Sequence, residues 1–374
     1  LIRALQANQG CLQEAQLADA VFMALGFDKT DPATLSEYLQ NPKAMGLHRQ
    51  NAQRTLRYVL GYRLLRDLRQ GWRFNNPNLD QLGLSQVDYH MLGEFCSDET
   101  FANTSNSDLR QLAPHNREQL SRLLFDEMRR NLCIDSLYLD AVEQDRAKAS
   151  AYSQLSERWA FQPDERLEAA NYLLTRSKKE LRGHRNLGFI SAAPRSRIIR
   201  LLKRASFWKD SSLASKVQDW KDDEWVQLVE DLLELAVDWG YIGKTEIDKE
   251  LAGYRLSASA LQWRLTEPEE TSNSYFRQLY LSLSQLLGQP EHPLFLFEAQ
   301  EHTAQVEAER RQELEQRFRF TQKDREEWSK REGKTGELER LPVMFCSPTM
   351  ELGVDISALN TVYLRNVPPT PANS

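Results

Sequence analysis

The feature that most constrains the fold is a short apolar run, Val343–Ser347, which leads into a polar loop. An apolar run that ends in a thiol and a hydroxyl is typical of a buried parallel strand that continues into a loop. Pro348 disfavours helix at the residue before it, and Gly353 permits close approach of the backbone. Open α/β sheets bind ligands at the carboxyl ends of their strands. We therefore expect the carboxylate of Asp355 to lie where a ligand would bind.

The same stretch resembles motif V of superfamily 2 nucleic-acid helicases, in which a small residue and Thr are followed after a few residues by Gly-x-Asp. Cys346-Ser347 stands in the first place and Gly353-Val354-Asp355 in the second. The resemblance implies that Ser347 faces the bound nucleic-acid strand and that Gly353 and Asp355 lie near the ribose and γ-phosphate of ATP. A helical turn beginning near Thr349 would add N–H groups that hold a phosphate oxygen beside Ser347.

The elements before this motif are also similar to part of the second RecA-like domain of these helicases. The expected order is a strand, a loop bearing His302, a helix, and the motif V strand. The helix string Arg311–Phe318 fits the family pattern Arg-x-x-x-Glu-x-x-Phe. The resemblance gives His302 a role in coupling the ATP and nucleic-acid sites. The alternative is a histidine that is only hydrogen-bonded within its loop.

Four other strings are similar to large bacterial helicases of the defence and repair kind, such as the DISARM-system helicase. In these proteins a long helical insertion divides the second RecA-like domain. The matching strings are Leu64–Arg69, Asn78–Gln81, Phe276–Tyr280 and Glu301–Gln305.

The chain departs from the helicase pattern in what it lacks. It contains no Gly-x-x-x-x-Gly-Lys-Ser/Thr string, no Asp-Glu-x-His box and no arginine-finger motif. We therefore expect a piece of a longer protein, without catalytic residues of its own. ATP and Mg²⁺ are expected in the full-length parent and not on this chain, and the missing first RecA-like domain is an expected partner.

Composition excludes several other classes of protein. None of the four cysteines is in a Cys-x-x-Cys pair, and the six histidines show no ligand-like spacing, so we expect no metal site. No run of about 18 apolar residues is present, and we expect no membrane span. Without a signal-type segment at its start, the chain is expected to be cytoplasmic.

The hydrophobic pattern predicts a mainly α protein with a C-terminal α/β part. Residues 1–210 are expected to form a helical insertion, with helices over 1–27, 49–70 and 114–132. Residues 211–289 contain a predicted helix at 222–239 ended by Gly240, followed by short strands, as in a winged-helix unit. An unspecific α+β packing unit is the alternative. Residues 290–374 are expected to be the C-terminal part of a RecA-like domain.

Basic residues gather in two places, although the net charge of −6 argues against general coating of nucleic acid. The segment 176–209 has eleven Lys and Arg residues and one Glu. We select its second half as a phosphate-binding surface, with a solvated face as the alternative. The selected residues are Arg195, Arg197, Arg200, Lys203 and Arg204.

The helix predicted at 49–70 carries the second set of basic residues. For this set we favour a solvated amphipathic face over a phosphate-tracking surface. Its arginines are Arg54, Arg57, Arg63, Arg66 and Arg69.

The sequence therefore leads to two alternative hypotheses about function. The first is a fragment of an ATP-dependent superfamily 2 helicase or translocase that acts on nucleic acid, with DNA favoured over RNA. The second is a non-catalytic helical or winged-helix module that binds nucleic acid or docks a protein partner through the helical part.

Overall fold

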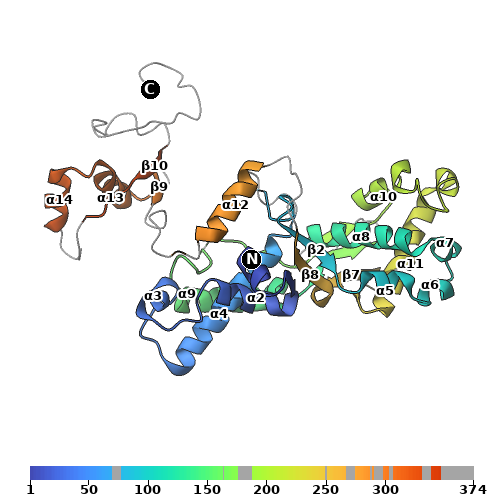
Figure 1. The fold of residues 1–374 in the computed structure, drawn as a ribbon, viewed down its shortest axis with the longest axis horizontal. Coiled ribbons are helices and arrows are strands. Elements are labelled where there is room, and N and C mark those ends of the chain that lie inside the picture. The colour runs from blue at the N-terminus through green and yellow to red at the C-terminus, as the bar shows by residue number, and fades with distance from the viewer. Residues whose placement is uncertain are drawn as a thin grey trace, which may run out of the picture. The chain divides into compact units, whose positions relative to one another are not determined.

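The computed structural model contains two compact units, Leu1–Ser284 and Gln285–Ser374 (Figure 1). The fold is mainly helical with an α/β part, as predicted. The structure describes residues 1–69, 77–162, 164–175, 188–248, 251–266, 274–286, 289, 298–302, 306–330 and 338–346.

One helical group of the first unit is built around α4 (Gly46–Arg66), which packs against α2 (Glu14–Ala24) and α9 (Ala141–Gln154). Two short helices complete the group, α1 (Ile2–Ala7) and α3 (Pro32–Tyr38). Asp31 caps α3 by accepting a hydrogen bond from the Thr34 N–H at 2.9 Å, and Pro32 occupies the first turn.

The predicted helix over residues 1–27 is wrong as a single element. Gln9 and Gly10 both have positive φ angles, of 57° and 79°, which end α1 and start the short strand β1 (Cys11–Gln13). Positive φ is uncommon for residues other than glycine and cannot continue a right-handed helix.

The other helical group contains α8 (Pro114–Arg130) and α11 (Asp222–Asp238), which follow the predicted helices closely. Gly240, with φ of 88°, follows the end of α11 as predicted. The shorter helices are α5 (Leu92–Ser97), α6 (Thr100–Asn103), α7 (Ser107–Gln111) and α10 (Arg197–Leu202). The 3₁₀ turns of the unit are η1 (Leu137–Leu139), η3 (Ala205–Phe207), η4 (Lys216–Asp219) and η5 (Ala258–Ala260).

Two sheets join these groups. In the first, β8 (Leu261–Leu265) lies between β1 and β2 (Ser85–Tyr89), antiparallel to both, with Cys11 opposite Arg264. In the second, β7 (Leu251–Ser257) pairs antiparallel with β6 (Ile242–Asp248) and β4 (Tyr172–Leu174), and parallel with β3 (Ile134–Asp135). Strand β5 (Phe189–Ser191) extends this sheet beyond β4. Each sheet therefore combines strands from within residues 1–210 with strands from within residues 211–289.

The last helix of the first unit, α12 (Ser274–Leu286), crosses the boundary between the units. Its residues Phe276, Tyr280 and Leu281 pack against a small cluster formed by Ile2, Leu82 and Leu84.

The second unit contains the parallel strands β9 (Ala299–His302) and β10 (Val343–Cys346). Helices α13 (Ala308–Arg319) and α14 (Gln322–Ser329) lie between them in the sequence. The left-handed residue Phe320, with φ of 50°, ends α13, and Thr321 with Asp324 forms a capping box that starts α14. Parallel pairing through a helical connection is the βαβ arrangement expected of an α/β domain.

Gly61 offers a direct test of the packing around α4. A Cβ at this position would lie against the Tyr138 ring, with Cδ1 only 2.8 Å away. The resulting overpacking, at about 1–3 kcal/mol, outweighs the gain of about 0.5–1 kcal/mol in helix propensity. Gly61→Ala should therefore lower the free energy of unfolding by about 1–2 kcal/mol in urea denaturation.

Gly93 in α5 provides the matched control, since a Cβ there would meet nothing within 4 Å. Gly93→Ala should leave the stability unchanged or raise it by up to about 1 kcal/mol. Equal losses in the two variants would refute the packing role of Gly61.

Candidate nucleic-acid interface

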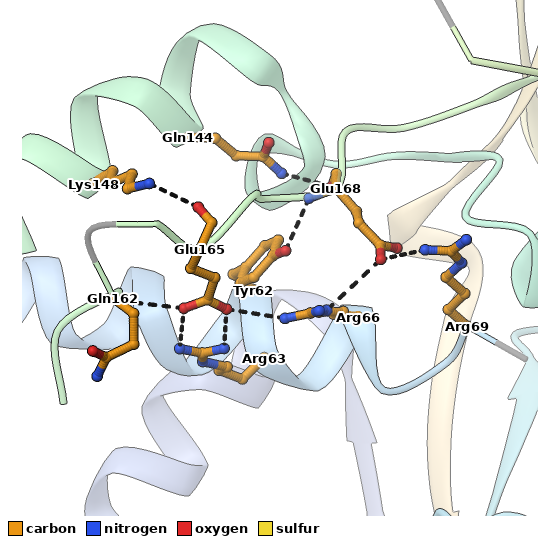
Figure 2. A network of polar contacts seen from close by, with 9 residues as sticks. All are labelled: Tyr62, Arg63, Arg66, Arg69, Gln144, Lys148, Gln162, Glu165 and Glu168. Carbon is orange, nitrogen blue, oxygen red and sulfur yellow. Dashed lines mark hydrogen bonds and ion pairs between the residues drawn. The ribbon is translucent and has the colours of Figure 1, made fainter. Parts of the chain in front are cut away.

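Three arginines, Arg63 and Arg66 near the end of α4 and Arg69 just beyond it, are bound by carboxylates of the same chain (Figure 2). Arg63 forms a two-point contact with Glu165, in which its Nη2 donates to Oε2 at 2.9 Å. Arg66 donates to the same carboxylate at 3.0 Å, and Arg69 pairs with Glu168. Glu165 and Glu168 belong to a stretch without helix or strand, residues 164–168, which we call the acidic segment.

Hydrogen bonds to its backbone hold the acidic segment in place. Lys148 and Gln144, both on α9, donate to the carbonyl oxygens of Glu165 and Glu168 at 2.7 and 2.8 Å. The N–H of Glu168 donates to the Tyr62 hydroxyl at 2.9 Å. The network therefore ties α4, α9 and the acidic segment together (Figure 2). This arrangement supports a structural role for Arg63, Arg66 and Arg69 and differs from the solvated face that we favoured.

The other arginines of α4 lie outside this network, and Arg49 donates to the Ala44 carbonyl at 3.0 Å. Arg57 pairs with Asp19 and lies 3.9 Å from the centre of the Phe22 ring. Arg54 is exposed.

The electrostatics of Glu165 follow from this geometry. Burial alone would raise the pKa of its carboxyl, but hydrogen bonds and charge from Arg63, with a contribution from Arg66, lower the pKa below its ordinary value. The ionised form of Glu165 is therefore stabilised in the folded protein.

The five basic residues selected from the sequence lie on α10 or directly beside it, and all five are exposed. The opposite side of α10 is fixed to the core, because Ile198, Ile199 and Leu202 are buried. The buried Trp208 also donates from its ring nitrogen to the Leu202 carbonyl at 2.6 Å, which satisfies one of the free carbonyls at the helix end.

Two of these five residues are already paired. Arg197 Nε lies 2.9 Å from Oε2 of the buried Glu127 in an ion pair, and Lys203 Nζ lies 2.5 Å from Asp222 Oδ1. Within the described part of the chain, the side chains of the other three form no ion pair or hydrogen bond. Those three are Arg195, Arg200 and Arg204.

His302 lies at the end of β9 and not in a loop as expected. Its backbone pairs with Cys346 in the parallel ladder, which places it in the strand. Its ring is 7% exposed, and its Nε2 is 2.8 Å from Glu315 Oε1 of α13. The Nδ1 atom is buried and has no hydrogen-bond partner among the described residues. Ser347, Thr349, Gly353 and Asp355 lie outside the described residues.

The expectation of a buried strand at residues 343–347 is wrong for the described part of it. Strand β10 is parallel to β9 as predicted, but Phe345 is 64% exposed and Cys346 is also exposed. The physical reason is that side chains of a strand point to the two faces of its sheet, and at Phe345 and Cys346 the described elements leave both faces of the β9–β10 ladder uncovered.

The sequence analysis did not predict several ion pairs between residues that lie far apart in the sequence. Glu165 and Glu168 have the same three-residue spacing as Arg63, Arg66 and Arg69, which was the available signal. A second case is Arg317 of α13, which is buried, pairs with Glu298 and donates to the Glu339 carbonyl at 3.1 Å. The Arg317 hydrogen bond lowers the pKa of the Glu298 carboxyl.

The described residues contain neither a metal-binding cluster nor a membrane-spanning helix. No group of three or more His, Cys, Asp or Glu side chains there is arranged to hold a metal ion. None of the helices described is both long enough and apolar enough to cross a membrane.

Comparisons with protein-family models, curated proteins and solved structures find no match to this chain.

The contact between Glu165 and its arginines should make part of the free energy of unfolding depend on pH. Because the folded pKa lies below the ordinary 4.5, this contribution is present above pH 4.5 and is lost as pH falls through the folded pKa. Glu165→Gln should lower the free energy of unfolding at pH 7 by about 1–3 kcal/mol. The variant should then lose less stability than the wild type on acidification.

Urea denaturation followed by tryptophan fluorescence between pH 7 and pH 3 measures both effects. Glu143→Gln is the control, because Glu143 forms an exposed pair with Arg146 and should cost less than about 0.5 kcal/mol. A Glu165→Gln variant as stable as this control would contradict the structural role.

Proposed function

We propose that this chain supplies a helical insertion and part of the second RecA-like domain of an ATP-dependent superfamily 2 helicase or translocase that acts on DNA. The observation that carries the proposal is the parallel pair β9 and β10, with α13 and α14 between them in the sequence. In the sequence, β10 runs directly into the string that resembles motif V.

The geometry of the second unit supports this reading in a specific way. Parallel strands have their carboxyl ends at the same edge, so His302 of β9 and the residue before Ser347 lie side by side there. Glu315 of α13 holds the His302 ring at that edge through a hydrogen bond of 2.8 Å. In this proposal, Ser347 and Thr349 contact the nucleic-acid strand, and Gly353 and Asp355 approach the nucleotide.

The residues of this chain do not form a complete site for ATP and Mg²⁺. The sequence has no phosphate-binding loop with its lysine and no acidic box to hold the metal. We therefore assign ATP and Mg²⁺ to the full-length protein, in which the first RecA-like domain would supply these groups. No step of the reaction is assigned to the chain alone.

The alternative is a non-catalytic module, in which α11 and the β6–β7 hairpin serve as a winged helix. Helix followed by hairpin is the observed order. However, α11 contains seven acidic residues and no Lys or Arg. An acidic helix is repelled by the phosphates that line a DNA groove, so α11 is not suited to base readout. The helicase reading is therefore the better supported of the two.

The decisive experiment measures ATP hydrolysis by the full-length protein with single-stranded DNA, duplex DNA and the corresponding RNAs. We expect hydrolysis that increases on addition of nucleic acid, most with DNA. Ser347→Ala should reduce this stimulation by about tenfold or more, because the hydroxyl proposed to contact the strand is removed.

Ser153→Ala is the matched control, since it removes an exposed hydroxyl from α9 and should leave the stimulation unchanged. The absence of hydrolysis with every nucleic acid would reject the helicase proposal. Full stimulation in Ser347→Ala would reject the role given to that residue.

A further inference from the structure

We infer that the α10 surface binds the sugar-phosphate backbone of duplex DNA without reading its sequence, through Arg195, Arg200 and Arg204. The inference rests on the proposed function, because it names the form of nucleic acid that the helical part contacts. Four observations support it: these arginines have no ion-pair partner in the described residues, α10 is fixed to the core, its length suits a few phosphates, and the aromatic side chains beside it are not exposed.

The first observation is the difference between free and bound arginines. Arg63 already makes two parallel hydrogen bonds to a carboxylate, and a phosphate would have to displace Glu165 to reach it. The side chains of Arg195, Arg200 and Arg204 are exposed and have no such partner in the described part of the chain. Their guanidinium groups can therefore contact phosphates without breaking an internal ion pair.

The second observation is that α10 is held firmly against the core. Trp208 is 1% exposed and packs against Trp220 and Trp225, with ring centres 6.3 and 5.9 Å away. Trp225 lies on α11, so the cluster joins α10 to a long helix. A fixed helix loses little conformational freedom when it binds, which favours association.

The third observation is that the length of α10 corresponds to a short run of DNA phosphates. The six residues of α10 span about 9 Å, at about 1.5 Å per residue. Each DNA strand carries a phosphate about every 3.4 Å along the helix axis. The helix therefore spans two or three consecutive phosphates, with Arg200 on it and Arg195 and Arg204 two residues beyond its two ends.

The fourth observation separates duplex from single-stranded DNA. Binding of single strands generally uses exposed aromatic rings on which bases stack. Beside α10, Trp208 and Trp225 are buried, and Phe207 packs against Trp208 with ring centres 5.0 Å apart. The exposed large aromatic side chains of the described residues lie on other elements, namely Tyr152, Tyr275 and Phe345. The α10 surface therefore offers charge without a stacking platform, as suits a duplex backbone.

The test is fluorescence anisotropy of the 374-residue chain with a labelled duplex of about 20 base pairs and a single strand of the same length, over a range of KCl concentrations. The wild type should bind the duplex more tightly than the single strand. The variant R195A/R200A/R204A should make the negative slope of log K against log salt shallower by about 2–3, at about 0.9 for each phosphate that is no longer neutralised.

The control variant R54A/R146A/R158A removes the same number of positive charges from exposed positions on other elements. It should keep the wild-type slope. Within the surface itself, Arg197→Ala should change the slope less than Arg200→Ala, because Arg197 is bound to Glu127.

Three results would overturn the inference: an unchanged slope in R195A/R200A/R204A, an equal loss in the control variant, or tighter binding of the single strand. Measuring ATP hydrolysis by the full-length protein separates the two proposals. If DNA stimulates hydrolysis and R195A/R200A/R204A keeps the wild-type slope, only the DNA-binding role of the α10 surface is rejected. The absence of both DNA binding and hydrolysis rejects the proposed function as well.

Discussion

The attachment of the acidic segment to α4 depends on the contact between Arg63 and Glu165. An ionised side chain that is largely removed from water is costly unless a partner of opposite charge compensates it. Glu165 is 13% exposed and receives hydrogen bonds from both Arg63 and Arg66. The acidic segment lies 102 residues after Arg63 in the sequence, and the contact therefore joins α4 to a distant part of the chain. Without it, one side of α4 would carry several cations against a half-buried surface.

This pairing also indicates where function can lie. The number of basic residues does not distinguish α4 from α10, since both helices carry clusters of them. The structure distinguishes them, because carboxylates of the same chain hold the cations at the C-terminal end of α4, whereas three arginines at α10 face solvent without a partner in the described residues. The two basic sets therefore differ in whether their cations are already paired, which their positions in the sequence do not reveal.

Sequence reasoning succeeded where the signal was local. The apolar spacing predicted α8 and α11, and the order of strands and helix in the second unit was correct. It failed where distant residues decide the outcome. The partners of Arg63 and the exposure of Phe345 depend on which segments meet, and periodicity contains no such information. The break at Gln9 and Gly10 was local, but the glycine was outweighed by the apolar stripe around it.

The pairing of β1 with β8 has a consequence for how the protein is made. Cys11 lies opposite Arg264, so the first strand of the chain has no partner in its sheet until residues 261–265 have been synthesised. At about 5–20 residues per second, the wait lasts roughly 10–50 s. During that interval the backbone of β1 has no ladder partner among the described strands. The β1–β8 ladder is therefore a contact that forms late in synthesis, and until then the backbone groups of β1 remain open to pairing with another strand edge.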